Sequence, residues 1–292
     1  NFSSLWVGDS ILTRHRLEPL TTLASIAALT KKVQIGTAIY LLHLRHPVHV
    51  AHATATLDQL SNGRFIFGIG VGTSHESTIN ESRNLGIPFS ERGAILNESL
   101  DVIRKLWRGE NVSSTGFYPF HNAHLDIPPT REPPIYIATT KFDPKSGFSN
   151  SIQKRIEQHA DGLMPQTSPS KYSSMISHAR DLVEKSERST SLIATNYTDV
   201  VIASSEEEAF SQARDYISSY YPWPISDAHL KEVGVFGPPE TVTKKIHSFI
   251  EAGVEHFIVR FPTFDQKNQL DLFFNNCLVI TENRKNPLRE IA

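Results

Sequence analysis

The sequence is poor in the features that mark several protein classes. It has one cysteine, Cys277, which excludes an internal disulfide framework and a cysteine-rich zinc site. Its 29 Lys and Arg residues against 31 Asp and Glu residues give a formal charge of −2, without the basic excess of a duplex-binding surface. No apolar run approaches the roughly 20 residues that span a bilayer. We therefore expect a small-molecule substrate and no nucleic-acid or membrane partner, and leave a homodimer open.

The amino-terminal residues also lack targeting features. The chain starts at Asn1 without an initiator Met, a basic leader or the apolar segment of a secretory signal. Together with the lone cysteine, this favours a cytoplasmic location, because the cytoplasm is a reducing compartment. The length of 292 residues fits one barrel-type domain of roughly 250 residues as well as two smaller domains.

What the sequence does contain is a repeated alternation of short apolar strands and amphipathic helices. The predicted strands cover residues 5–7, 33–42, 64–70, 135–138, 161–164, 192–203 and 256–261. The predicted helices between and after them begin near residues 19, 47, 91, 149, 170, 206, 238 and 270. Near-continuous apolar strands that alternate with helices are typical of a parallel sheet covered by helices on its outside. The sequence therefore predicts an α/β fold.

The count of strands favours a TIM (β/α)8 barrel over a doubly wound open sheet, which is the alternative. Seven strands can be counted, and a closed eight-stranded barrel needs one more upstream. We therefore expect this chain to lack the first strand and helix of its barrel. No linker divides the chain, so we expect a single domain over residues 1–292. Two segments interrupt the alternation of strands and helices: residues 109–133, which resemble a short hairpin, and the proline-rich stretch 221–238.

Active sites of β/α barrels lie beyond the carboxyl ends of the strands. The residues in these places are Asp9, Ser10, Tyr40, Leu41, His43, Gly70 to His75, Thr139, Thr140, Met164 to Gln166, Arg260 and Phe261. Asp9 at a strand end can bind the polar edge of a ligand, or it can cap the approach to a helix. Ser149 and Ser151 precede a helix whose free N–H groups favour a phosphate, although serine there is more often only a cap.

Glycines alternate along one strand, at Gly68, Gly70 and Gly72. They do not form the G-x-G-x-x-G fingerprint that opens a helix in dinucleotide-binding folds. Because glycines at period 2 bare one face of a strand, they admit either a flat ligand or a tightly packed neighbouring layer.

Histidines are numerous, but their spacing does not indicate a metal site. His49 and His52 lie three apart on a predicted helix without an evident third ligand, so we expect no metal. His43, Arg45 and His46 follow a strand end and are better placed for substrate or cofactor contacts. No nucleophile motif or phosphate-binding loop is present, which favours chemistry carried by a cofactor.

Several motifs resemble those of the bacterial luciferase-like monooxygenase family over essentially the whole chain. They lie at residues 4–10, 33–38, 44–48, 55–64, 68–72, 88–93 and 237–242. The resemblance implies a TIM barrel that binds FMN or the deazaflavin coenzyme F420 at the carboxyl ends of its strands. It is nearest to the subgroup described as F420-dependent oxidoreductases.

The resemblance also implies roles for individual residues. Asp9 would lie beside the flavin or deazaflavin ring, and Tyr40-Leu41 would form the non-prolyl cis peptide that supports the ring in many relatives. Gly70 and Gly72 would allow the close approach of the ring. The phosphate end would be held by Thr139, Thr140, Ser149 and Ser151.

Two departures from the family pattern bear on the reaction. Relatives that act on sugar phosphates or alcohols carry a His directly after the Asp, where this chain has Ser10, and Thr73 stands where they have an acid. A hydroxyl is a poor general base. We expect a flavin- or deazaflavin-dependent oxidoreductase that transfers a hydride to, or oxygenates, a small organic substrate. The alternative is a flavin-binding barrel without turnover.

Two further assignments, of catalytic and of substrate-binding residues, complete the expected site. Asp9, His43 and His46 are the candidate catalytic residues, and Ser10 and Arg45 are the candidate substrate-binding residues.

Overall fold

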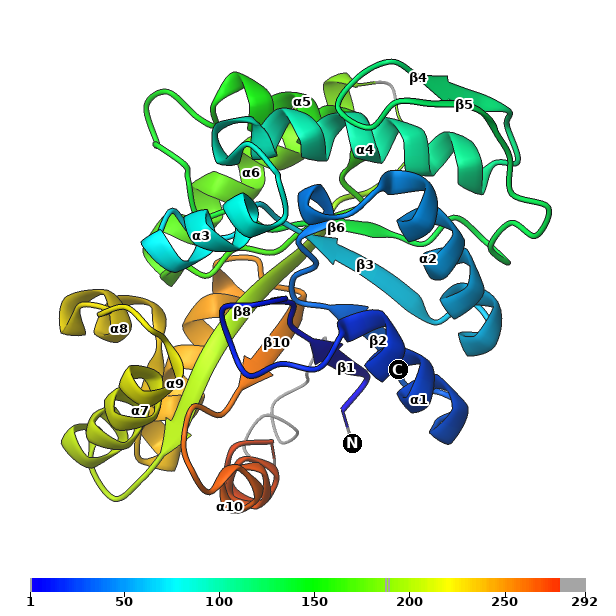
Figure 1. Ribbon diagram of the computed structural model, residues 1–292. Coiled ribbons are helices and arrows are strands. Elements are labelled where there is room, and N and C mark those ends of the chain that lie inside the picture. The colour runs from blue at the N-terminus through cyan, green and yellow to red at the C-terminus, as the bar shows by residue number, and fades with distance from the viewer. Residues whose placement is uncertain (1, 187, 189, 279–292) are drawn as a thin grey trace. The chain divides into compact units, whose positions relative to one another are not determined.

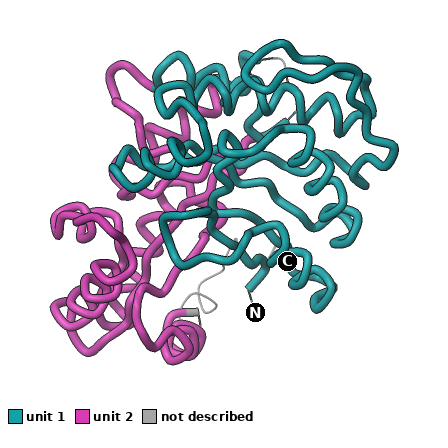
Figure 2. Tube along the Cα trace, in the orientation of Figure 1, with its two compact units in different colours: residues 1–138, 148–162, 182–191 teal, residues 139–147, 163–181, 192–292 magenta. Residues whose placement is uncertain are grey.

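The computed structural model describes residues 2–186, 188 and 190–278, and within them strands alternate with helices along the chain (Figure 1). The chain groups into two compact units that interleave in sequence (Figure 2). Unit 1 comprises residues 1–138, 148–162 and 182–191, and unit 2 comprises residues 139–147, 163–181 and 192–292. The expectation of one domain over 1–292 stays a prediction.

Unit 1 contains a parallel sheet with strand order β1-β2-β3-β6. Its strands are β1 (Ser4–Val7), β2 (Gln34–Thr37), β3 (Phe65–Ile69) and β6 (Ile135–Ile137). Its helices are α1 (Pro19–Leu29), α2 (Pro47–Ser61), α3 (Glu76–Asn84), α4 (Arg92–Trp107) and α5 (Asn150–His159), with short 3-10 turns η1 (Leu42–Leu44) and η2 (Phe89–Glu91). All five residues of β3 are buried, as expected of a strand covered on both faces.

Unit 2 is built on β8 (Ile193–Ile202), which pairs in parallel with β10 (His256–Arg260) and β9 (Val235–Gly237). Its helices are α7 (Glu206–Tyr220), α8 (Asp227–Val233), α9 (Pro239–Glu251) and α10 (Gln266–Leu272), followed by the π-helical turn η3 (Phe273–Leu278). Strand β7 (Gly162–Leu163) and helix α6 (Pro169–Lys185) have residues in both units.

Most of the predicted elements are present, and the differences have local causes. The strand predicted over 33–42 ends at Thr37, and the chain then forms a single bridge at Tyr40 before the turn η1. The excursion 109–133 contains an antiparallel hairpin of β4 (Val112–Ser114) and β5 (Phe120–Ala123). Helix α8 lies in the proline-rich stretch. Glu187 and Val279, the predicted ends of two helices, lie outside the described residues.

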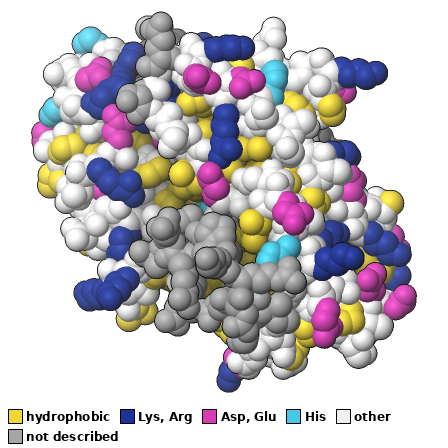
Figure 3. All heavy atoms as spheres, turned by 180° about the vertical axis from the view of Figure 1, so that it is seen from behind, with side chains coloured by type: hydrophobic (Ala, Val, Ile, Leu, Met, Phe, Trp, Pro, Cys, Tyr) yellow, Lys and Arg dark blue, Asp and Glu magenta, His cyan; other side chains and the backbone are white. Residues whose placement is uncertain are grey.

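Charged side chains of both signs share the protein surface. Figure 3 shows Lys and Arg side chains interspersed with Asp and Glu side chains on the face opposite to that of Figure 1. This distribution agrees with the near-neutral formal charge. No helix within the described part of the chain is long and apolar enough to cross a membrane.

Arg64 joins the ends of two helices in unit 1. Its Nε donates to the carbonyl of Ser61 at the end of α2 (2.7 Å), and its Nη atoms donate to Val33 O (2.6 Å), Ala27 O (3.0 Å) and both oxygens of Thr30 (3.0 and 3.1 Å). The last carbonyls of a helix have no partner within the helix, and a cation near them also interacts favourably with the helix dipole. Arg64 therefore fixes the carboxyl ends of α1 and α2 beside β3.

We expect Arg64→Ala to lower the free energy of unfolding by about 3 kcal/mol, because several partly buried carbonyls lose a charged donor at once. The measurement is urea denaturation at pH 7. Arg83→Ala is the matched control, since the exposed Arg83 side chain donates only to Asn80 Oδ1 among the described residues, and it should cost less than about 0.5 kcal/mol. Equal losses in the two variants would contradict this role of Arg64.

Candidate active site

The candidate active site in unit 1 begins at Asp9, two residues beyond β1. Its backbone N–H donates to Ile39 O (3.1 Å), which continues the pairing of β1 with the neighbouring strand. Its carboxylate is fully excluded from solvent and accepts a hydrogen bond from Leu41 N (2.9 Å). Burial of a carboxylate requires a partner charge or several donors.

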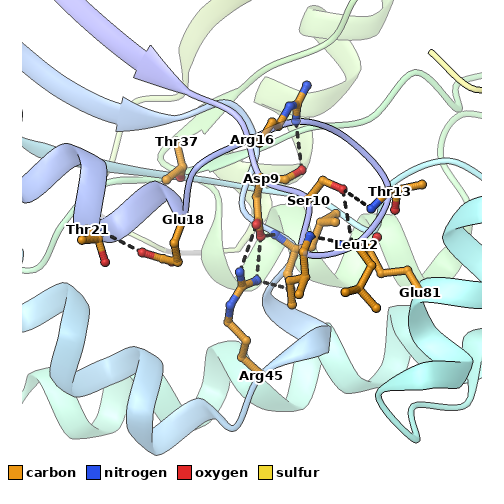
Figure 4. Close-up of polar contacts among 12 residues, drawn as sticks. Asp9, Ser10, Leu12, Thr13, Arg16, Glu18, Thr21, Thr37, Arg45 and Glu81 are labelled. Carbon is orange, nitrogen blue, oxygen red and sulfur yellow. Dashed lines mark hydrogen bonds and ion pairs between the residues drawn. The ribbon is translucent and has the colours of Figure 1, made fainter. Parts of the chain in front are cut away.

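Arg45 supplies that partner charge. Its Nη1 lies 2.6 Å from Asp9 Oδ2 and its Nη2 lies 3.0 Å from Asp9 Oδ1, so the guanidinium binds both carboxylate oxygens (Figure 4). The same guanidinium lies 4.3 Å from the centroid of the Tyr40 ring. Burial raises the pKa of the Tyr40 hydroxyl well above its usual value, so Tyr40 stays neutral. The structure thus joins three residues that the sequence assigned separately.

The peptide between Tyr40 and Leu41 corrects one expectation. The cis peptide bond joins Ala38 and Ile39, two residues earlier than the sequence resemblance implied. The Tyr40–Leu41 peptide is instead fully hydrogen-bonded, because Tyr40 O accepts from Gly70 N (3.2 Å) and Leu41 N donates to Asp9.

Gly70 and Gly72, just beyond β3, pack against the segment that contains Ile39 and Leu41. A Cβ at Gly70 would collide with the Ile39 side chain, and a Cβ at Gly72 would approach a methyl group of Leu41 to 3.2 Å. Gly72 also has a positive φ of 68°, which favours glycine. The absence of side chains at Gly70 and Gly72 therefore lets Ile39 and Leu41, in the segment after β2, pack closely against the residues that follow β3. Their role toward a cofactor ring stays a prediction.

Ser10 and the residues after it are held by Glu81 of α3. Glu81 Oε1 accepts hydrogen bonds from Ile11 N (2.6 Å), Leu12 N (2.7 Å) and Ser10 Oγ (3.3 Å). Glu81 is buried, and sequence reasoning missed it because α3 is polar and shows no apolar periodicity. Both Ser10 and Glu81 lie close to Asp9 in Figure 4.

His43 and His46 have different surroundings. His43 is buried in η1, and its Nδ1 has no hydrogen-bond partner among the described residues. Burial, together with the positive charges of Arg92, Arg45 and Arg155, lowers the pKa of His43 to about 3. His46 caps α2 through Nδ1, which accepts from Val48 N (3.3 Å).

His46 also packs on the hairpin that follows α4. Its ring centroid lies 5.2 Å from that of Tyr118 and 5.8 Å from that of Phe120. The Tyr118 hydroxyl donates to His43 O (2.9 Å). The excursion 109–133 therefore contacts the segment that carries both histidines. The catalytic roles of His43 and His46 stay predictions.

Ser149 and Ser151, which the sequence predicted to hold a phosphate, lie at the amino end of α5. Ser149 is the N-cap residue, but its side chain makes no capping hydrogen bond, and both Ser149 and Ser151 are exposed. Asn97 Nδ2 of α4 donates to the Ser151 hydroxyl (3.4 Å). Asn97 Oδ1 in turn accepts from Arg155 Nε (2.8 Å), and Gly93 O accepts from Arg155 Nη2 (3.2 Å).

Arg155 is buried, and within the described part of the chain no carboxylate pairs with it. Burial lowers the pKa of its guanidinium to about 10. Among the described residues, Arg92 at the start of α4 likewise has only neutral partners, Phe89 O (2.8 Å) and Ser74 Oγ (3.0 Å), and its Nε has none. Arg155 lies on the helix face of Ile152 and Ile156, a spacing that could have revealed it as buried.

Two predicted residues, Thr139 and Thr140, belong to unit 2. Thr139 Oγ1 accepts from Lys141 N (3.2 Å). In the same unit, Arg260 binds both oxygens of Asp199 (2.6 and 2.7 Å), and Gln166 Nε2 donates to Asp199 (3.1 Å). Within the described residues, no group of three or more His, Cys, Asp or Glu side chains could hold a metal ion.

A family model described as luciferase-like monooxygenase matches residues 1–222 of the 292. The chain belongs to the luciferase-like monooxygenase family. The F420-dependent glucose-6-phosphate dehydrogenase of Amycolatopsis mediterranei is 28% identical over 302 residues, which cover 94% of this chain and 89% of that protein. The protein of the same name from Kineococcus radiotolerans is also 28% identical, covering 92% of this chain and 86% of its own length.

Solved structures with the same fold include two enzymes of different kinds. An F420-dependent secondary alcohol dehydrogenase in complex with an F420-acetone adduct has a TM-score of 0.79 at 22% identity, covering 96% of this chain and 90% of that chain. The oxygenating constituent of 3,6-diketocamphane monooxygenase from Pseudomonas putida, in complex with FMN, has a TM-score of 0.70 at 18% identity, covering 94% and 88%. The predicted luciferase-like, TIM-barrel-type α/β fold is confirmed.

We expect Arg45→Met to lower the free energy of unfolding at pH 7 by about 3–5 kcal/mol, because it leaves the Asp9 carboxylate buried without a counter-charge. Urea denaturation measures this loss. The double variant Asp9→Asn with Arg45→Met also removes the buried carboxylate charge and should recover part of the lost free energy of unfolding. A loss below about 1 kcal/mol in Arg45→Met would show that the pair is not buried in solution.

We expect His43 to make unfolding dependent on pH between about 6.5 and 3. Its pKa is lowered in the folded protein, so the unfolded chain binds the extra proton first, and stability present above pH 6.5 is lost as the pH falls toward 3. From pH 7 to pH 5, the wild type should lose about 2 kcal/mol more than His43→Gln. Parallel losses in the two proteins, measured by urea denaturation at both pH values, would contradict this.

Proposed function

We propose that this chain is an oxidoreductase that binds a flavin or deazaflavin in unit 1 and acts on a small organic substrate, with coenzyme F420 as the first candidate cofactor. The relatives described above are named as F420-dependent dehydrogenases, and they match nearly the full length of the chain. When bound, the ring would exchange a hydride with a carbon of the substrate.

The observation that carries this proposal is positive charge beside the amino end of α5 that pairs with no carboxylate in the part of the chain that the structure describes. Arg155 and Arg92 are held by neutral acceptors, and both act on His43. A buried cation normally has a counter-ion. Asn97 bonds both the Arg155 guanidinium and the Ser151 hydroxyl, and Ser149 makes no capping hydrogen bond at a helix terminus that favours anions. These residues fit the phosphate end of such a cofactor.

The other end of the unit 1 site fits the ring. The Asp9–Arg45 pair gives a fixed polar edge, and Tyr40 and Leu41 lie beside it. Because both oxygens of Asp9 are bound by Arg45, Asp9 would orient the ring through the pair rather than take up a proton. The phosphate roles of Thr139 and Thr140, which belong to unit 2, stay predictions.

FMN is the second candidate cofactor, and with it the reaction would be oxygenation. A solved structure in complex with FMN shares the fold over 94% of this chain. A flavin-binding barrel without turnover is the remaining alternative, because Ser10 is a weak base. We also propose a cytoplasmic location, a single barrel domain over residues 1–292 and a homodimer as the working assembly.

We expect the purified chain to bind F420 more tightly than the phosphate-free deazaflavin chromophore, and Arg155→Met to remove most of that difference. A charged hydrogen bond to phosphate contributes about 1.5–3 kcal/mol, so the preference should fall at least roughly tenfold. Fluorescence titration measures the four dissociation constants. FMN and riboflavin form the parallel pair for the second candidate.

Lys154→Met is the matched control, because Lys154 is the exposed neighbour of Arg155 on the same helix and carries the same charge. It should leave the preference for the phosphate unchanged. Binding of FMN alone would favour the oxygenase, whereas no binding of either cofactor would overturn the proposed function. Binding without turnover of any tested alcohol or ketone would favour the flavin-binding alternative.

A further inference from the structure

The segment that follows Asp9 is held by one carboxylate oxygen. Glu81 Oε1 accepts from two successive backbone N–H groups, Ile11 N at 2.6 Å and Leu12 N at 2.7 Å, and from the Ser10 hydroxyl at 3.3 Å. Successive N–H groups that converge on one oxygen form an anion-binding concavity. Glu81 reaches this concavity from α3, about 70 residues away in the sequence.

The side chains of this segment do not hold it in place. Ile11 is 38% exposed and Leu12 is 60% exposed, so neither is packed in the core. On the other side of Asp9, Arg16 Nη1 donates to the Asp9 carbonyl (2.9 Å). The backbone from Asp9 to Leu12 is therefore fixed by hydrogen bonds to two charged side chains (Figure 4).

The hydrogen bonds of Ser10 determine what its hydroxyl can offer a ligand. A serine hydroxyl has one donor and two acceptor sites. Its proton is directed at Glu81 Oε1, and one lone pair accepts from Thr13 N (3.1 Å). One lone pair remains. Ser10 can therefore accept a further hydrogen bond but cannot donate one.

We propose that Glu81 is a positioning residue that fixes Ser10 as a hydrogen-bond acceptor beside Asp9, so that the site favours substrates with an O–H donor, that is, alcohols, over their carbonyl counterparts. The preference for alcohols rests on the proposed function, whereas the positioning role of Glu81 does not. Glu81 acts only through Ser10 and the backbone of Ile11 and Leu12.

The first test measures the hold of Glu81 on the segment without any cofactor. In Glu81→Ala, amide hydrogen exchange at Ile11 and Leu12 should accelerate at least roughly tenfold, because both N–H groups lose their acceptor. Glu81→Gln keeps a carbonyl oxygen and should stay within roughly threefold of the wild type. Glu76→Gln, an exposed change of the same charge on α3, is the control. Unchanged exchange in Glu81→Ala would overturn the proposal.

The second test uses the F420-loaded chain with 2-propanol as the donor probe and acetone as the acceptor probe. The wild type should bind 2-propanol in preference to acetone. Glu81→Ala should shift this preference roughly fivefold toward acetone, because Ser10 then loses the acceptor that takes up its proton and can donate to the ligand, whereas Glu81→Gln, which keeps an acceptor oxygen, should retain the preference. Loosening of the fold alone would weaken both probes equally.

Ser10→Ala keeps the backbone hold of Glu81 while removing the hydroxyl. It should retain slow exchange at Ile11 and Leu12 but lose the preference for 2-propanol. A wild type that prefers acetone, or that binds neither probe, would overturn the acceptor role of Ser10. Failure of F420 and FMN to bind would overturn the proposed function instead, and the exchange experiment would still decide the role of Glu81.

Discussion

The ion pair between Asp9 and Arg45 is the interaction on which the candidate site depends. A carboxylate with no exposed surface is stable only with a partner charge, and Arg45 meets it with two parallel hydrogen bonds. Through this pair, the segment after β1 is bound to the turn after β2, and Leu41 N adds a third contact. Glu81 extends the same network to α3, so three separate stretches of unit 1 converge beside Asp9.

A second constraint is the imbalance of charge between α4 and α5. Arg155 is buried among neutral acceptors, and its positive field, with those of Arg92 and Arg45, helps to keep His43 uncharged. An arrangement of this kind costs folding free energy unless an anion completes it. The phosphate of a flavin or deazaflavin would supply the missing negative charge. The same physical requirement, a counter-charge for each buried ion, applies to both Asp9 and Arg155.

Sequence reasoning predicted the fold better than the site. The proline-initiated helices α1, α2 and α9 and the apolar strands β3 and β8 carry their signals in neighbouring residues. Asp9, Ser149 and Ser151 could be named because they follow strands or begin a helix. Glu81 could not, since its helix is polar and its partners lie about 70 residues away. The predicted position of the cis peptide was wrong, since the cis bond joins Ala38 and Ile39 and nothing in the local sequence distinguishes that bond from its neighbours.

By itself, the sequence determined the α/β class, the order of the elements, the family motifs and the kind of cofactor to expect, because these depend on local periodicity and on short contiguous patterns. The tertiary structure alone decided which charges meet. Arg45 pairs with Asp9 across 36 positions, and Arg155 lies against Gly93 and Asn97 without a carboxylate partner among the described residues. Whether a charged side chain is a free ligand group, half of an ion pair or a buried cation that needs an anion depends on distance in space, which periodicity does not contain.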